Sequence, residues 1–154
     1  MDPRFDLQTD TPDAFKAIYA LEQTARKAVG DDILYDMVKL RASIINGCSF
    51  CVDMHSTDLG TRGEDTRRIM AVAAWRESAF FSPAERAAFA LTDEVTRLGE
   101  HGVTDAVWDE AVTHHGLAGA ADLVVAIATI NVWNRLAVTA HAPTPPLESA
   151  TAAA

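Results

Sequence analysis

Helix start and stop signals divide this chain from one end to the other, and they limit it to one class of fold. The clearest is Ser82-Pro83-Ala84-Glu85, where serine caps a helix, proline takes the first position and glutamate closes a capping box. Thr11-Pro12 gives a similar start, while Gly30 and Asn46-Gly47 give stops because glycine and asparagine tolerate left-handed backbone. No stretch alternates between polar and apolar residues for long enough to form a strand. The sequence therefore predicts an all-α fold.

Apolar residues recur at helical spacing between these signals. We expect helices over about residues 12–29, 31–46, 48–63, 64–76, 83–99, 104–114 and 118–140. In the helix over 64–76, the inner face should carry Ile69, Met70, Val72 and Ala73. The last helix is apolar nearly all round, which is typical of a helix buried in a core or in a subunit interface.

Length and charge restrict the class of protein further. With 154 residues the chain matches one domain, spanning residues 1–154 with a core over about 14–140. Residues 141–154 contain three prolines and a run of alanine, which favours a mobile tail. The formal net charge of −9 argues against binding to nucleic acid or to an anionic membrane.

The location of the protein is also suggested by its composition. The longest uncharged stretch, Leu123–Asn134, is shorter than the roughly 20 apolar residues of a membrane span. The first ten residues are polar and acidic, without the apolar region of a secretory signal. Two cysteines in such a chain favour a reducing cytoplasm, where a cysteine pair is more often catalytic or metal-binding than structural.

Residues 46–55, Asn-Gly-Cys-Ser-Phe-Cys-Val-Asp-Met-His, carry the chemistry. Cys48 and Cys51 are three residues apart, and Cys51 and His55 are four apart, so a helix places all three side chains on one face. If this helix begins after Gly47, its N-terminal N–H groups and the imidazole both favour a thiolate. A low-pKa cysteine beside a second thiol is the layout of a thiol redox centre.

Other interpretations of the same residues remain open. Cys48 and Cys51 could be buried small side chains without a chemical role. With His55 they could bind zinc, but a structural site needs a fourth ligand, which only His114 or His115 could supply. Haem attachment through C-x-x-C-H fails because residue 52 is valine. A thioredoxin-like site fails because the motif does not follow a strand in a βαβ unit.

Polar residues in apolar surroundings are more simply structural. Asn131, Trp133 and Asn134 lie in the apolar last helix and are expected to tie helices or subunits together. Arg41 and Arg76 are expected to pair with nearby acidic residues.

The segment from Leu40 to His55 resembles the core of the alkylhydroperoxidase D-like, or carboxymuconolactone decarboxylase, family. Residues 73–77, 80–82 and 127–136 are similar to the smaller single-domain members, so the likeness covers about residues 14–140. The resemblance implies an all-helical fold, assembly into homo-trimers or homo-hexamers, and a peroxidase that needs no metal, haem or other cofactor.

Carried over residue by residue, the resemblance assigns four catalytic positions. Cys51 matches the peroxidatic cysteine, Cys48 the resolving cysteine, and His55 the histidine that helps deprotonate the nucleophile. Asp36 stands where the family's proton relay has a glutamate, and its shorter side chain suggests that a water bridges it to His55. Phe50 replaces a histidine of the best-known member, which should make the pocket more apolar.

These assignments predict a thiol-dependent peroxidase acting on small hydroperoxides, with an external dithiol as reductant. A lactone decarboxylase that does not depend on the cysteines is the main alternative. A non-catalytic helical oligomer, in which the disulfide changes packing only, is the other.

Overall fold

The regular structure of the protein is helical throughout the part of the chain that the structure describes. The computed structural model describes residues 2–147, and its elements, in chain order, are α1 (Leu7–Asp10), α2 (Pro12–Val29), α3 (Asp32–Asn46), α4 (Ser49–Thr61), α5 (Thr66–Ala71), the 3-10 turn η1 (Val72–Ala74), α6 (Pro83–Arg97) and α7 (Asp105–Ala140). The sole β-type pairing among these residues is an isolated bridge between Gly99 and Gly102. The predicted all-α fold is confirmed.

The helix boundaries follow the local signals in the sequence. Ser82 and Glu85 form the predicted capping box at the start of α6. Gly30 and Gly47 end α2 and α3 with φ of +69° and +66°, a conformation that costs glycine little. The Asp31 side chain accepts the N–H of Leu34 and caps α3.

Three features differ from the expected helices. The segment over 64–76 forms only α5 and η1, and both Met70 (73% exposed) and Ala73 are exposed, so the prediction that these two residues lie on the inner face was wrong. So short a segment covers the core along one edge, where Ile69 of α5 and Val72 of η1 pack against it. The short helix α1 was not predicted, although Asp6 caps it by accepting two backbone N–H groups.

The third difference concerns the end of the chain. The two expected helices join into α7, but Gly116 inside it has φ 71° and ψ 166°, so the expected break is present as a kink. Of the predicted tail, residues 148–154 lie outside the described residues, while Thr144 contacts Ser49 through their hydroxyl groups, 3.2 Å apart.

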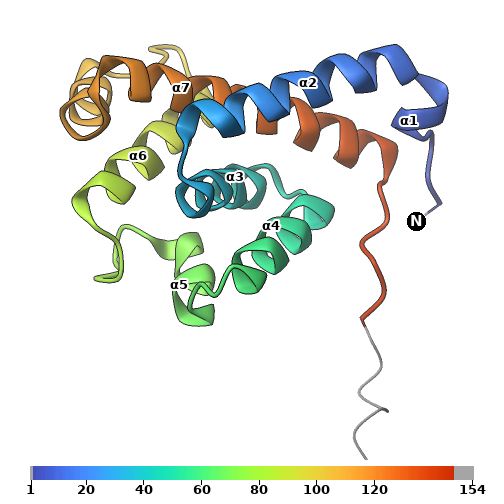
Figure 1. Ribbon diagram of the computed structural model, residues 1–154, viewed down its shortest axis with the longest axis horizontal. Coiled ribbons are helices and arrows are strands. Elements are labelled where there is room, and N and C mark those ends of the chain that lie inside the picture. Colours follow the sequence, from blue (N-terminus) through green and yellow to red (C-terminus); the bar gives the residue numbers. More distant parts are fainter. Residues whose placement is uncertain (1, 148–154) are drawn as a thin grey trace, which may run out of the picture.

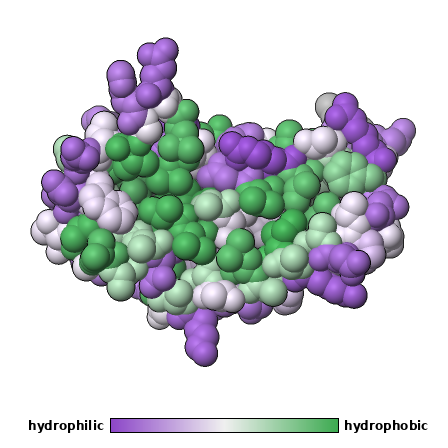
Figure 2. Space-filling view, turned by 90° about the horizontal axis from the view of Figure 1, so that it is seen from above, coloured by the Kyte–Doolittle hydropathy of each residue, from purple (hydrophilic) through white to green (hydrophobic). Residues whose placement is uncertain are grey.

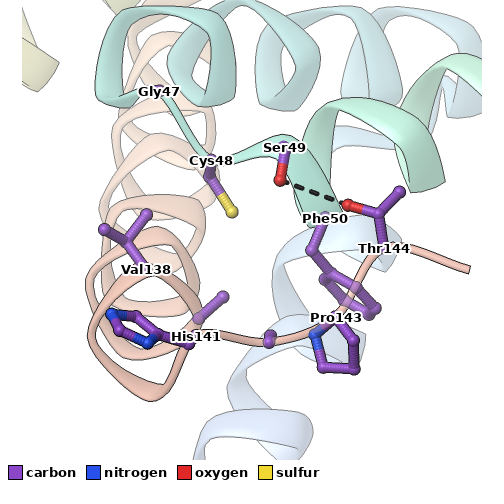
Figure 3. A pocket seen from close by; sticks show the side chains of 10 residues that line it. Gly47, Cys48, Ser49, Phe50, Val138, His141, Pro143 and Thr144 are labelled. Carbon is purple, nitrogen blue, oxygen red and sulfur yellow. Dashed lines mark hydrogen bonds between the residues drawn. The ribbon is translucent and has the colours of Figure 1, made fainter. Parts of the chain in front are cut away.

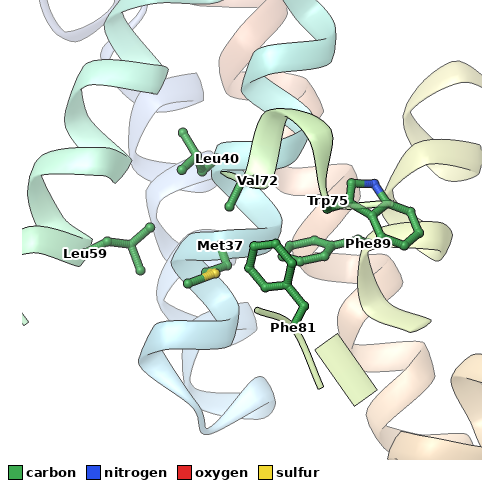
Figure 4. Close-up of a cluster of buried hydrophobic side chains, with 7 residues drawn as sticks. All are labelled: Met37, Leu40, Leu59, Val72, Trp75, Phe81 and Phe89. Atoms are coloured by element: carbon green, nitrogen blue, oxygen red, sulfur yellow. The ribbon is translucent and has the colours of Figure 1, made fainter. Parts of the chain in front are cut away.

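Helix α3 occupies the middle of the molecule, between α4 on one side and α2 and α7 on the other (Figure 1). Every residue from Tyr35 to Ser43 is buried. On one side of α3, Met37 and Leu40 pack with Leu59, Val72 and the aromatic residues Trp75, Phe81 and Phe89 (Figure 4). This central position brings the charged residues of α3 into the interior, where each needs a partner.

The interior polar residues are paired across helices. Arg41 donates through Nε to Asp93 of α6 over 2.6 Å, and Arg76 lies 3.1 Å from the same carboxylate. Asn46 at the end of α3 donates to Asn131 and Asn134 of α7 over 3.0 and 2.9 Å. The predicted structural roles of these arginines and asparagines are confirmed.

Helix α7 lies on one face of the molecule and also reaches the core. By length and hydropathy alone it could cross a membrane, but Leu123 and Ile127 are buried against Val38 of α3 and Leu91 of α6. Figure 2, which looks onto the side of α2 and α7, shows apolar side chains spread across that face. On these helices Leu21, Val125 and Val132 are about 40% exposed.

Candidate functional site

The cysteine motif opens helix α4, as its sequence suggests. After Gly47 ends α3, Cys48 is the N-cap of α4, and its Sγ accepts the backbone N–H of Cys51 over 3.4 Å. The structure pairs the two sulfurs as a disulfide, with Cα atoms 5.4 Å apart, a usual spacing for such a bond. Both cysteines are almost completely buried.

His55 lies one turn beyond Cys51 on the same face of α4. It is buried, and its Nδ1 is 3.3 Å from Oδ1 of Asp36 on α3. Among the described residues, neither ring nitrogen has a hydrogen-bond partner of good geometry. The contact is direct, so the shorter aspartate reaches the imidazole without the bridging water that the sequence suggested.

Two arginines hold Asp36 on its other side. Arg26 of α2 donates to Oδ1 over 2.9 Å, and Arg62 beyond the end of α4 donates to Oδ2 over 3.2 Å. Burial acts to raise the pKa of Asp36, but His55 and Arg26 outweigh it and hold that pKa below 3.8. Asp36 is therefore an anion at neutral pH, and it links α2, α3 and α4.

The same surroundings keep His55 neutral. Burial lowers the pKa of His55 below 6.5, against the opposing effect of the Asp36 carboxylate. A neutral imidazole has a free lone pair that accepts a proton. The pair His55–Asp36 is thus suited to take a proton from a neighbouring thiol.

A second buried network was not predicted from the sequence. Glu22 of α2 accepts from Lys39 and from the Tyr35 hydroxyl at 2.9 Å through Oε1, and from Trp133 Nε1 over 3.1 Å through Oε2. Burial lowers the pKa of Lys39, which Glu22 opposes. One signal could have found Glu22: it shares the buried stripe of α2 with Ala25, where a carboxylate needs a partner.

These groups meet at a cavity of about 300 Å³, which we call the Cys51 pocket. Its polar lining includes Cys51, His55, Glu22 and Lys39, and its aromatic lining comprises Phe15, Tyr19, Phe50 and Trp133. Phe50 thus contributes apolar surface, as expected. Three of the four predicted catalytic residues gather here, since Asp36 touches His55 from behind, while Cys48 is bonded to Cys51 but lies outside the lining of this cavity.

The contacts around the possible metal ligands do not favour a metal site. Asp36, His55 and Asp58 lie close enough together to hold a cation, but Arg26 and Arg62 already occupy the Asp36 carboxylate. His115 contacts the Ala84 carbonyl at 2.9 Å and His114 contacts Glu110 at 3.1 Å. Neither histidine lines a pocket with the cysteines, so the fourth ligand of a Cys48–Cys51–His55 zinc site is not supplied by them.

Comparison with known proteins places this site in a family. The model of the carboxymuconolactone decarboxylase family matches residues 12–94, which include Asp36, both cysteines and His55. The chain belongs to the carboxymuconolactone decarboxylase family. The predicted family is confirmed.

Relatives extend the likeness over almost the whole chain. It is 32% identical to the uncharacterized protein YdfG of Bacillus subtilis (strain 168) over 138 residues, 90% of this chain and 94% of that one. A crystal structure of ATU0492 from Agrobacterium tumefaciens, a protein of unknown function provisionally named as the antioxidant defence protein AhpD, is 36% identical, with a TM-score of 0.91 over 94% of this chain and 99% of that one.

A more distant structure supports the fold alone. The alkylhydroperoxidase AhpD core of a peroxidase-related protein from Ralstonia eutropha JMP134 is 22% identical, with a TM-score of 0.75 over 90% of this chain and 74% of that one. The fold of this chain is therefore AhpD-like.

Proposed function

We propose that the protein is a thiol-dependent peroxidase that reduces small hydroperoxides through a Cys48–Cys51 dithiol–disulfide cycle. The observation that carries the proposal is the placement of Cys51, a neutral buried imidazole and its carboxylate partner at one aromatic-lined pocket, with the Cys48 sulfur bonded to Cys51. The relation to ATU0492 agrees with it.

The cycle begins with proton transfer from the Cys51 thiol to His55, which Asp36 stabilises once it is charged. The Cys51 thiolate attacks the outer peroxide oxygen, an S–O bond forms and the O–O bond breaks. The alcohol leaves with the proton from His55, and Cys51 is left as a sulfenic acid. The Cys48 thiol then attacks the Cys51 sulfur and releases water as the disulfide forms.

An external dithiol completes the cycle by returning two electrons and two protons. None of these steps calls for a metal, haem or other cofactor. We further propose that the chain works as a homo-oligomer, a trimer or hexamer, in the reducing cytoplasm, without nucleic-acid or membrane partners. The apolar face of α2 and α7 is one candidate for the contact between subunits.

Titration of the reduced protein with hydrogen peroxide or cumene hydroperoxide tests the proposal. One equivalent of peroxide per chain should remove two thiols per chain in the wild type, one in Cys48→Ser and none in Cys51→Ser. Ser56→Ala, on the same helix but outside the pocket, should match the wild type. If no hydroperoxide oxidises the wild type, the peroxidase proposal is wrong.

A lactone decarboxylase is the second candidate, because His55 and Glu22 line the pocket independently of the cysteines. Decarboxylation that survives replacement of both cysteines by serine would favour it. A third reading, a non-catalytic redox-sensing oligomer, would be favoured by a Cys51 thiol pKa at or above about 8.5, the value of a free cysteine.

A further inference from the structure

The two sulfurs of the pair face different cavities. Cys51 lines the Cys51 pocket together with His55. Cys48 lines a separate hollow of about 430 Å³, which we call the Cys48 pocket, formed by the start of α4, the end of α7 and the chain that follows α7. Figure 3 shows the sulfur of Cys48 pointing into this hollow, between Val138 and Thr144.

The two cavities differ in their lining residues. Phe50 and Ala137 line both cavities, and they also line a third cavity of about 520 Å³ that borders the two. Neither cysteine lines this third cavity or the cavity of the other cysteine. Because Cys48 and Cys51 are only 1% and 2% exposed, any reagent must reach each sulfur through its own cavity. The polar character of the two sides also differs, since Glu22, Lys39 and His55 all lie on the Cys51 side.

We propose that the external dithiol enters the Cys48 pocket and attacks Cys48, while the hydroperoxide enters the Cys51 pocket and is attacked by the Cys51 thiolate alone. This inference rests on the proposed function and assigns the two half-reactions to two entrances. The attacking thiolate forms an S–S bond with Cys48 as the Cys48–Cys51 bond breaks, and Cys51 leaves as a thiolate. The second thiol of the reductant then displaces Cys48, which leaves as a thiol once protonated, and the reductant becomes a cyclic or protein disulfide.

The choice between the sulfurs depends on access and on the stability of the departing thiolate. The N–H of Cys51 donates to Cys48 over 3.4 Å, an ordinary distance for a sulfur acceptor, and favours negative charge there, so the assignment rests on access. A thiolate released at Cys51 shares its pocket with the neutral His55, with the cations Lys39 and Arg26, and with the carboxylates Glu22 and Asp58. Attack at Cys48 therefore releases Cys51 directly as the thiolate that reacts with the next peroxide.

Adduct mapping tests which sulfur is attacked. The protein is first oxidised with diamide, so the test does not depend on any reaction with peroxide. It is then exposed briefly to glutathione and N-ethylmaleimide, quenched in acid, and digested for mass spectrometry. Glutathione is expected on Cys48 and maleimide on Cys51. The reverse pattern, or an even distribution, would overturn the inference.

A matched pair of tryptophan variants tests the entrances. Val138 and Thr144 line the Cys48 pocket alone, and Gln23 lines the Cys51 pocket alone. Val138→Trp should slow reduction of the diamide-formed disulfide by dithiothreitol roughly tenfold, because exchange depends on access, and should leave oxidation by cumene hydroperoxide within about twofold of wild type. Gln23→Trp should do the opposite.

Thr144→Trp tests the same prediction as Val138→Trp from another side of the Cys48 pocket. It covers the case in which the new side chain of Val138→Trp turns to solvent. The two-entrance inference would be overturned if one variant slowed both half-reactions. It would also be overturned if none of the three variants slowed either half-reaction. Failure of the proposed peroxidase function gives a different result, namely normal reduction by dithiothreitol with no oxidation of the wild type by hydroperoxide.

Discussion

The buried pair of Glu22 and Lys39 should be strongly coupled in its effect on stability. Lys39 is 2% exposed and donates to Glu22, which also accepts from Tyr35 and Trp133. Glu22→Gln keeps the shape but leaves Lys39 as a buried cation without a counterion. Removing one partner of a buried pair costs about 3–5 kcal/mol, and we expect about 3 because the amide oxygen still accepts one hydrogen bond.

Lys39→Met should be the milder change. It removes the cation together with the cost of burying it, and Glu22 retains two neutral donors, so we expect a loss of about 2 kcal/mol, the scale of one hydrogen bond to a charged group. The double variant has neither charge. Its loss should be about 3 kcal/mol, so that the coupling free energy is about 2 kcal/mol.

Urea unfolding followed by circular dichroism measures all four proteins. For a domain of this size, a loss of 3 kcal/mol lowers Tm by about 6–12 °C, which gives an independent check. Tyr19→Phe, at an exposed position on the same helix, serves as the control and should leave stability unchanged. A double variant as unstable as the sum of the two single variants would refute the reasoning.

The remaining predictions concern the kink at Gly116, the Asp36–His55 pair and the effect of low pH on stability. Gly116→Ala should lose about 1–3 kcal/mol because φ 71° and ψ 166° form a region that is essentially restricted to glycine. Gly60→Ala, in the last turn of α4 where nothing lies within 4 Å of an added Cβ, should gain at most about 0.5 kcal/mol. Equal effects of the two changes in urea unfolding would count against the kink. Asp36→Asn should slow peroxide oxidation of Cys51 by about 100-fold at pH 7 if the carboxylate supports His55 as a base, and stopped-flow rates close to wild type would contradict that role. His55 has a pKa below 6.5 when folded, so the unfolded chain binds more protons there and stability must fall as the pH drops below about 6.5. His55→Gln should flatten this part of the stability profile, and an unchanged slope between pH 7 and 5 would show that His55 does not cause it.

Signals that act within a few residues were readable from the sequence. The capping box of Ser82 and Glu85 and the stop at Gly30 depend on neighbouring backbone groups. They therefore predicted where α6 begins and where α2 ends. The spacing of Cys51 and His55 likewise fixes their common face once α4 exists, whereas Cys48 is the N-cap and lines another cavity. Met70 was placed on the inner face because apolar periodicity predicts which face of a helix is buried. Periodicity does not predict how long the helix is or how much of it the core covers.

The parts of the site that depend on helix packing could not be predicted in the same way. Asp36 and His55 meet because α3 and α4 pack with these side chains 3.3 Å apart, whereas the length of the aspartate side chain alone suggested a gap bridged by water. Glu22 reaches the pocket only because α2 packs over α3, and its partner Trp133 is 111 positions away in the chain. The family resemblance supplied Asp36 but gave no indication of Glu22.

The most direct measurement of the central claim locates the oxidised sulfur. Reduced Cys48→Ser protein is mixed with one equivalent of cumene hydroperoxide in the presence of dimedone, which traps a sulfenic acid, and the labelled residue is identified by mass spectrometry. The account predicts one dimedone per chain on Cys51, one cumyl alcohol released, and loss of both in Cys48→Ser with His55→Gln added. Peroxide reduction without a label on Cys51, or reduction that persists when both cysteines are replaced by serine, would contradict it.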